Sequence, residues 1–182
     1  MNDQTALIRY PIVPIWRRGA ALIVDCLPAW VIAALAGDLF LGFLVLFWSV
    51  WAGLRVAVVS QQHGQSLGRW AFNLRVAEVE TGRTPQIQDL IKREAIVGLG
   101  AALAVYSLSH LGQNGAWVLL SLPLLGDCCI ALTEATKRQA FHDQIANTIV
   151  VKSRRGYGLD HKIPAWMFKS KKRFAEARRR VK

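Results

Sequence analysis

Cysteine is scarce in this sequence, and the motifs that mark most enzymes are missing. The 182 residues include three cysteines, Cys26, Cys128 and Cys129. All three lie in apolar runs without the CxxC spacing of zinc or redox sites, so we expect packed thiols and predict no metal site and no cofactor. The sequence also lacks a nucleophile elbow, an HExxH motif, a Walker loop and a recognisable pair of catalytic carboxylates. We therefore do not expect an enzyme.

Acidic residues are few as well, at 12 Asp and Glu against 23 Lys and Arg. Residues 152–182 contain twelve Lys or Arg and two acidic residues, which accounts for ten units of the net charge of +11. Residues 1–151 are therefore close to neutral, and 53% of the whole chain is apolar. This profile is typical of a compact membrane protein, here with a basic tail.

Four apolar runs approach the roughly 20 residues that a membrane-spanning helix needs. They cover residues 19–37, 39–59, 95–111 and 116–133. The first run is too long for the core of a secretory signal and no small-residue cleavage site follows it, so we expect it to stay in the membrane. Short connections at 36–38 and 112–115 join the runs in pairs. The sequence thus predicts an all-α membrane protein with four transmembrane helices in two hairpins.

Lysine and arginine are absent from the two short connections but present at the N-terminus, in the central loop (60–94) and after the fourth run. Because positive residues near span ends are retained in the cytoplasm, we predict that both termini and the central loop are cytoplasmic. In that loop, LRVAEV (74–79) alternates like a strand and is expected to pair with TIVVK (148–152) in a small ribbon. Thr84 and Pro85 precede an amphipathic helix that is expected to run into the third span.

The basic tail, residues 152–182, is predicted to contain an amphipathic helix. Its apolar stripe includes Trp166 and Phe174, and its cations lie off that stripe: Lys169, Lys171, Lys172, Arg173, Arg178 and Arg179. Such a helix favours an anionic membrane surface, with each nearby cation contributing about 1 kcal/mol. Nucleic-acid binding and a plain solubilising role are the alternatives. No nucleic-acid motif accompanies the charges, so we expect lipid rather than nucleic acid as the partner.

Asp25 lies inside the first apolar run, where an unpaired aspartate costs about 2.5–3.5 kcal/mol. In the predicted topology Arg55 of the second run and Asp127 of the fourth lie at a similar depth. We therefore predict a cluster of Asp25, Arg55 and Asp127, with Glu94 nearer the surface. Three interpretations remain open: an ion-pair network that fixes helix register, a site for a cation or proton, or a wet vestibule.

Four blocks of the sequence occur together in an order that resembles a known family. They are RRGAALIVD (17–25), GQSLGR (64–69) with LRVAEVETGRTP after it, Arg93 before the third run, and FHDQIANTIVV (141–151). This order resembles the RDD family of bacterial membrane proteins, named for one arginine and two aspartates. The resemblance places these on Arg18, Asp25 and Asp143, the last beside His142. It covers roughly residues 14–151, so we expect an RDD transmembrane domain at 1–151 and a separate tail at 152–182.

The resemblance departs from the family pattern in two places. Arg69 stands where lysine is common, and the basic tail lies outside the pattern. By resemblance, His142 and Asp143 are expected to matter, and an Arg18–Asp143 contact would close the bundle at its inner mouth. From the residues alone, His142 and Asp143 suit a turn or a helix cap.

The resemblance implies a multi-pass protein of the bacterial cytoplasmic membrane with a role in transport, and some family members are described as sodium/proton antiporters. We accordingly predict cation/proton exchange through the Asp25 cluster, in a homo-oligomer. The alternative is an accessory or assembly subunit that scaffolds a larger complex with partner membrane proteins.

Overall fold

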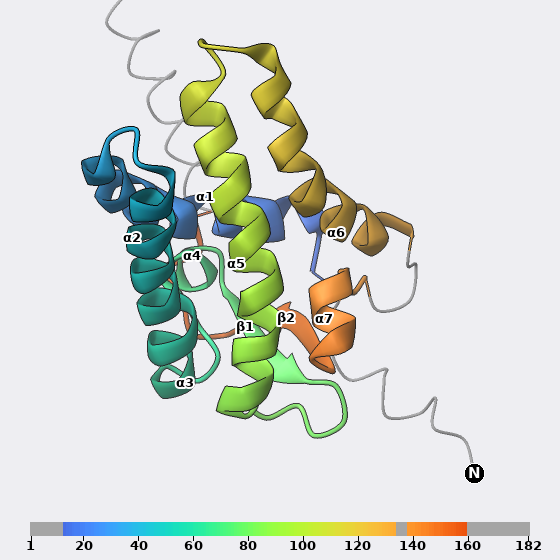
Figure 1. Ribbon diagram of the computed structural model, residues 1–182. Helices are drawn as coiled ribbons and strands as arrows, with labels where there is room; N and C mark the ends of the chain where they lie inside the picture. Colours follow the sequence, from blue (N-terminus) through green and yellow to red (C-terminus); the bar gives the residue numbers. More distant parts are fainter. Residues whose placement is uncertain (1–12, 134–137, 160–182) are drawn as a thin grey trace, which may run out of the picture.

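The computed structural model describes residues 13–133 and 138–159 and is mostly helical (Figure 1). The first half contains α1 (Ile15–Ala33), the 3-10 turn η3 (Ala34–Ala36), α2 (Phe40–Ala52), the π-helical turn η4 (Gly53–Ala57), α3 (Val58–Gln61), α4 (Leu67–Ala71) and β1 (Leu74–Glu78). The second half contains α5 (Ile87–His110), the 3-10 helix η5 (Gly115–Ser121), α6 (Leu122–Thr133), α7 (Phe141–Ile145) and β2 (Thr148–Lys152). The predicted amphipathic tail helix lies outside the described residues.

Three helical segments among the described residues are long and apolar enough to cross a membrane. They are Ile15–Ala36, Phe40–Gln61 and Gly115–Thr133, which correspond to the first, second and fourth predicted runs. Many of their large apolar side chains face outward, as lipid contact requires, including Ile23, Leu41, Val45 and Leu125. The chain is therefore a membrane protein with at least these three candidate spans.

The third predicted run forms part of α5, which is not among those three segments because its first two turns are charged. Asp89, Lys92, Arg93 and Glu94 all precede the apolar stretch of this single 24-residue helix. The prediction that an amphipathic helix continues without a break into the third apolar run is confirmed. In Figure 1, α2, α5 and α6 run up and down the view, whereas α1 runs across it behind α5.

The fourth run begins as a 3-10 helix and becomes α-helical only at Leu122. Asn114 caps the first part, since its side-chain oxygen accepts a hydrogen bond of 3.0 Å from the backbone nitrogen of Ala116. Pro123 lies in the first turn of α6, where its missing N–H is tolerated. This change of helix type alters which faces of the run point inward.

The predicted ribbon is confirmed. β1 and β2 pair antiparallel with Val76 opposite Val150. On its other side, Val76 donates a 2.9 Å hydrogen bond to the carbonyl of Gly64, which has a φ of 86°. A Cβ on Gly64 would collide with the Val76 carbonyl, so this position requires glycine for both conformation and space. The loop that carries Gly64 is thus held against the ribbon.

The largest apolar core lies between α1, α2 and α5. Phe43, Phe47 and Trp51 form a stacked row along α2, and they pack against small side chains of the two neighbouring helices. A Cβ on Gly98 of α5 would lie 2.6 Å from the Trp51 indole nitrogen, so the ring fits only because Gly98 has no side chain. This core positions the charged residues that lie directly beyond Trp51.

Candidate functional site

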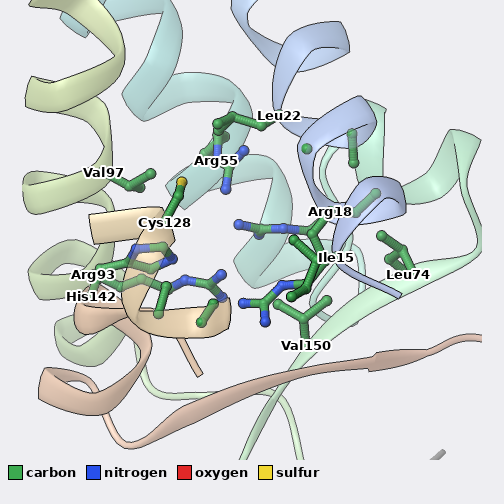
Figure 2. Close-up of a pocket in the computed structure, with 15 residues that line it drawn as sticks. Ile15, Arg18, Leu22, Arg55, Leu74, Arg93, Val97, Cys128, His142 and Val150 are labelled. Carbon is green, nitrogen blue, oxygen red and sulfur yellow. The ribbon is translucent and has the colours of Figure 1, made fainter. Parts of the chain in front are cut away.

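Charged side chains gather around a cavity of about 170 Å³ between the first turns of α1, the π-helical turn, α5 and α7 (Figure 2). Its charged lining consists of Arg18, Arg55, Arg69 and Arg93, with His142 beside them. The remaining lining is apolar, with Leu22, Val97 and Val150 among its members. Five elements, α1, η4, α4, α5 and α7, therefore meet at one charged centre.

Asp25 of α1 is fully buried and accepts hydrogen bonds from three different groups. The hydroxyl of Ser66 is 2.6 Å away, the backbone nitrogen of Gly68 is 2.7 Å away, and Nη1 of Arg55 is 2.9 Å away. A Cβ on Gly68 would collide with the carbonyl of Ala21, one turn before Asp25. Asp25 therefore holds the GQSLGR segment against α1, and the missing side chain at Gly68 lets the two backbones meet.

Arg55 links three helices at the π-helical turn η4. Beside its bond to Asp25, its Nε lies 2.8 Å from Oε2 of Glu94 in α5, and its guanidinium is 4.6 Å from the centre of the Trp51 ring. Single π turns within α-helices are frequent at functional sites. The sequence prediction that Asp25 and Arg55 lie together agrees with this geometry.

Glu94 is the centre of the network rather than a residue near the surface as predicted. It is 1% exposed, and Oε1 accepts a 2.8 Å hydrogen bond from Arg69 while Oε2 binds Arg55. Glu94 was misplaced because the rotation of α5 about its axis, which the sequence pattern did not predict, directs this side chain toward Arg55 and Arg69. Sequence reasoning also missed Arg69 as a site residue, although it follows directly after Gly68 in the motif.

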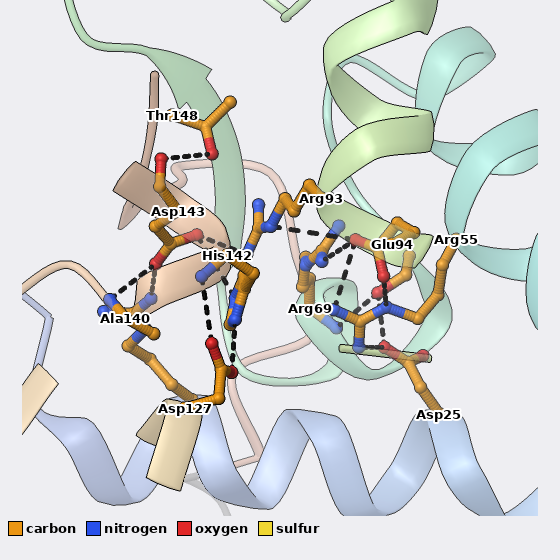
Figure 3. A network of polar contacts seen from close by, with 12 residues as sticks. Asp25, Arg55, Arg69, Arg93, Glu94, Asp127, Ala140, His142, Asp143 and Thr148 are labelled. Atoms are coloured by element: carbon orange, nitrogen blue, oxygen red, sulfur yellow. Dashed lines mark hydrogen bonds and ion pairs between the residues drawn. The ribbon is translucent and has the colours of Figure 1, made fainter. Parts of the chain in front are cut away.

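Asp143, at the third position of α7, forms a second centre (Figure 3). Its carboxylate binds Arg18 of α1 and lies 2.9 Å from Nη2 of Arg93 in α5. Burial alone would raise the pKa of this carboxyl, but the guanidinium groups of Arg93 and Arg18 outweigh burial and hold the pKa well below its usual range. Asp143 also accepts a 3.4 Å hydrogen bond from the nitrogen of Ala140. Asp143 therefore makes the expected contact with Arg18 and also caps the start of α7.

Asp127 of α6 does not join Asp25 and Arg55, so the predicted three-residue cluster is wrong in its third member. One oxygen accepts a 2.9 Å hydrogen bond from the backbone nitrogen of His142, and the other lies 2.5 Å from Nδ1 of the same residue. The prediction compared only the depth of Asp127 in the membrane with that of Asp25 and Arg55. It did not include the rotation of α6 about its axis, which follows the 3-10 segment η5 and directs Asp127 toward α7. Asp127 therefore ties α6 to α7.

Metal ligands do not assemble here. Within residues 13–133 and 138–159, no three His, Cys, Asp or Glu side chains come together as a metal site would require. Cys26 and Cys128 are half-buried free thiols, and Cys129 is an exposed one. The chemistry of the site is that of guanidinium groups and carboxylates.

Residues 12–147 match the model of the RDD family. The chain belongs to the RDD family. No curated protein and no solved structure gives a significant match. Of the three residues that the resemblance assigned to the motif of this RDD protein, Arg18 and Asp25 lie on α1 and Asp143 lies on α7, and only Arg18 and Asp143 contact each other directly. Arg93, which precedes the third apolar run, connects with both carboxylate centres, at 2.9 Å from Asp143 and 3.8 Å from Glu94.

Proposed function

We propose that this RDD-family protein spans the bacterial cytoplasmic membrane four times, with both termini inside, and exchanges a cation for protons through Asp25. The four-span arrangement is supported by α5, whose residues 95–109 carry no charge and lie against η5 and α6. With α5 as the third span, its charged first turns lie at the cytoplasmic side. The basic residues then also fall on that side.

The observation that carries the proposal is the position of Arg55 between two carboxylates on two different helices. Asp25 of α1 and Glu94 of α5 lie 2.9 and 2.8 Å from its nitrogens. Nη2 of Arg55 also donates to Glu94 at 3.4 Å, so the guanidinium already makes two bonds to this residue. If the bond between Arg55 and Asp25 breaks, Arg55 therefore still has Glu94 as a charged partner.

Two states of Asp25 follow from this geometry. In one, Arg55 neutralises the carboxylate. In the other, a cation or proton takes the place of Arg55, which remains bonded to Glu94. In each state Asp25 is neutralised and Arg55 keeps a carboxylate partner, which matters because unpaired charges in a membrane are costly. A ligand that stabilises one of two such states shifts the population between them. Four spans are few for alternating access, which supports a homo-oligomer.

The test is ion flux in proteoliposomes that contain the purified protein. Addition of Na⁺ or K⁺ to a vesicle with a preset pH gradient is expected to move protons with the wild-type protein and not with Asp25→Asn. The matched control is Asp38→Asn, because Asp38 is 98% exposed in the connection between α1 and α2. Undiminished flux in folded Asp25→Asn would rule out Asp25 as the site, and a wild-type protein without cation-dependent proton movement would rule out exchange.

A second candidate function is supported by the last span. In α6 only Asp127 and Ala131 are buried, and large apolar side chains such as Leu122, Leu125 and Leu132 face outward. This surface suits a partner membrane protein as well as lipid, as an accessory or assembly subunit requires. Purification in mild detergent separates the two functions, since a scaffold retains a partner at a constant ratio and an exchanger does not need one.

A further inference from the structure

The cavity in Figure 2 is lined by hydrogen-bond donors and by apolar groups. Among the described residues that form its wall, the polar ones are Arg18, Arg55, Arg69, Arg93 and His142, and none of the wall side chains contains an oxygen atom. The labelled guanidinium groups of Arg18, Arg55 and Arg93 turn toward the same space. The neighbouring carboxylates bind these arginines from outside the cavity.

Several of the donors at this cavity have no acceptor. Nη1 of Arg69, together with Nε and Nη1 of Arg93, is buried without a hydrogen-bond partner among the described residues. Arg69 is 3% exposed and Arg93 is 2% exposed, so water outside the protein does not satisfy these atoms. Buried donors of charged groups are rarely left in this way, because the loss of hydration is expensive.

The numbers of charged groups in the network also favour an anion in this cavity. Four arginines face three carboxylates, Asp25, Glu94 and Asp143, while Asp127 is engaged by His142. The second nitrogen of His142 lies 3.4 Å from the carboxylate of Asp143. Burial, together with the like charges of Arg55 and Arg93, lowers the pKa of the Arg69 guanidinium to about 9. The guanidinium groups at this cavity therefore outnumber the carboxylates that contact them.

We propose that this cavity binds a phosphate-type oxyanion between Arg69, Arg93 and Arg18. A tetrahedral oxyanion presents acceptors in several directions and suits guanidinium groups that converge from different helices. At about 170 Å³ the cavity is smaller than sites for drug-sized ligands and has room for a single small group. This anion site goes beyond ion exchange at Asp25 and does not depend on it.

The phosphate can come from a free ion or from the headgroup of a lipid. Both share the same chemistry toward arginine. The lining near Arg18 opens toward the surface, since Gly19 is exposed and the Arg18 side chain is 13% exposed. An entrance at the start of α1 is accessible to an ion from the cytoplasm and to a headgroup from the inner leaflet in the proposed topology.

Binding is tested on the full-length protein in dodecyl maltoside, a detergent without phosphate. Inorganic phosphate, sulfate and chloride are titrated at constant ionic strength, and the melting temperature and calorimetric heat are recorded. Phosphate and sulfate are expected to bind saturably and to raise the melting temperature, whereas chloride is not. A phosphorus assay on the purified protein and titration with short-chain phosphatidylglycerol distinguish the two sources, because a resident lipid brings about one phosphorus per chain.

Three variants locate the site. Arg69→Gln removes a donor and is expected to raise the dissociation constant for phosphate at least about tenfold, the effect of one charge-assisted hydrogen bond. Ala131→Leu fills the cavity from α6 without changing any charge and is expected to abolish binding. Arg83→Gln, at an exposed arginine, is the matched control and keeps wild-type affinity.

If Arg69→Gln does not fold, Ala131→Leu still decides the position of the site, because its charges are those of the wild type. Equal phosphate affinity in folded Ala131→Leu and wild type would overturn the proposal. It would also be overturned if neither phosphate, sulfate nor phosphatidylglycerol affected the wild-type protein more than chloride did.

Discussion

The carboxylate of Asp25 lies 2.7 Å from the backbone nitrogen of Gly68, and this contact fastens α4 directly to the candidate membrane span that contains α1. Ser66 and Arg55 complete the set of donors around the same carboxylate. Asp25 and the GQSLGR block (64–69) are thus two halves of one structural unit. Asp25 lies in an otherwise apolar helix because its carboxylate binds Ser66 and Gly68 at that depth.

Gly68→Ala tests how closely these two backbones must meet. A Cβ at Gly68 collides with the Ala21 carbonyl, which is backbone and cannot move aside alone. We expect the substitution to separate α4 from α1, weaken the Gly68–Asp25 hydrogen bond and lower the melting temperature in detergent by several degrees. Gly126→Ala is the control, because a Cβ there meets nothing within 4 Å. Similar melting temperatures for the two variants would contradict this account.

Asp143→Asn tests the second centre. The substitution leaves Arg18 and Arg93 without their shared carboxylate, and loss of one partner from a buried ion pair typically costs about 3–5 kcal/mol. We expect a large loss of stability at neutral pH, measured by thermal or denaturant unfolding in detergent. Asp38→Asn, at an exposed aspartate, is expected to unfold like the wild type.

The pH dependence of stability follows from the same carboxylate. Because the pKa of Asp143 is lower in the folded protein than the unfolded value of about 3.9, its contribution is fully present above about pH 5. The contribution is lost as the pH falls below that value toward the folded pKa. The difference in stability between wild type and Asp143→Asn should therefore be constant from pH 8 to 5 and shrink in stronger acid. A difference that grows on acidification would contradict the assigned charges.

Cysteine labelling tests the proposed four-span topology. After replacement of Cys26, Cys128 and Cys129 by alanine, single cysteines are introduced at Gln113, between α5 and η5, and at Thr81, between β1 and α5. In intact cells, an impermeant maleimide is expected to label position 113 and not position 81. In inverted vesicles the result should be reversed. Labelling of both positions from one side would mean that α5 does not cross the membrane.

The basic tail can be tested as a peptide of residues 163–182. We expect it to bind vesicles that contain phosphatidylglycerol and to dissociate as salt is added, because the attraction is electrostatic and screened. Replacement of Trp166 and Phe174 by alanine is expected to weaken binding without changing its dependence on lipid charge. Equal binding to neutral vesicles would show that the cations do not drive the association.

Sequence reasoning predicted the features that depend on position along the chain. The apolar runs predicted the long helices, and the alternating pattern predicted the ribbon. The number of residues from the end of each of the first two runs predicted that Asp25 lies near Arg55. These quantities are set locally by helix rise and side-chain period. These features can be predicted without knowing the rotation of each helix about its own axis.

The errors concern rotation about a helix axis. Asp127 lies in a predicted span but faces His142, because the 3-10 stretch of η5 and the start at Leu122 determine the direction of α6 side chains. Glu94 was predicted to lie nearer the surface, although it is buried on α5 and contacts Arg55. Rotation depends on tertiary packing, including the fit of Trp51 on Gly98, which no local pattern contains.

The ion pair between Arg18 and Asp143 also has a consequence for biosynthesis. The two residues are 125 positions apart, and at about 5–20 residues per second the ribosome needs roughly 6–25 s to make the chain between them. Throughout that time α1 must enter the membrane without the partner of its boundary arginine. The final network therefore assembles only after α7 has been synthesised, and a chain truncated before α7 leaves Arg18 and Arg93 without the carboxylate that they share.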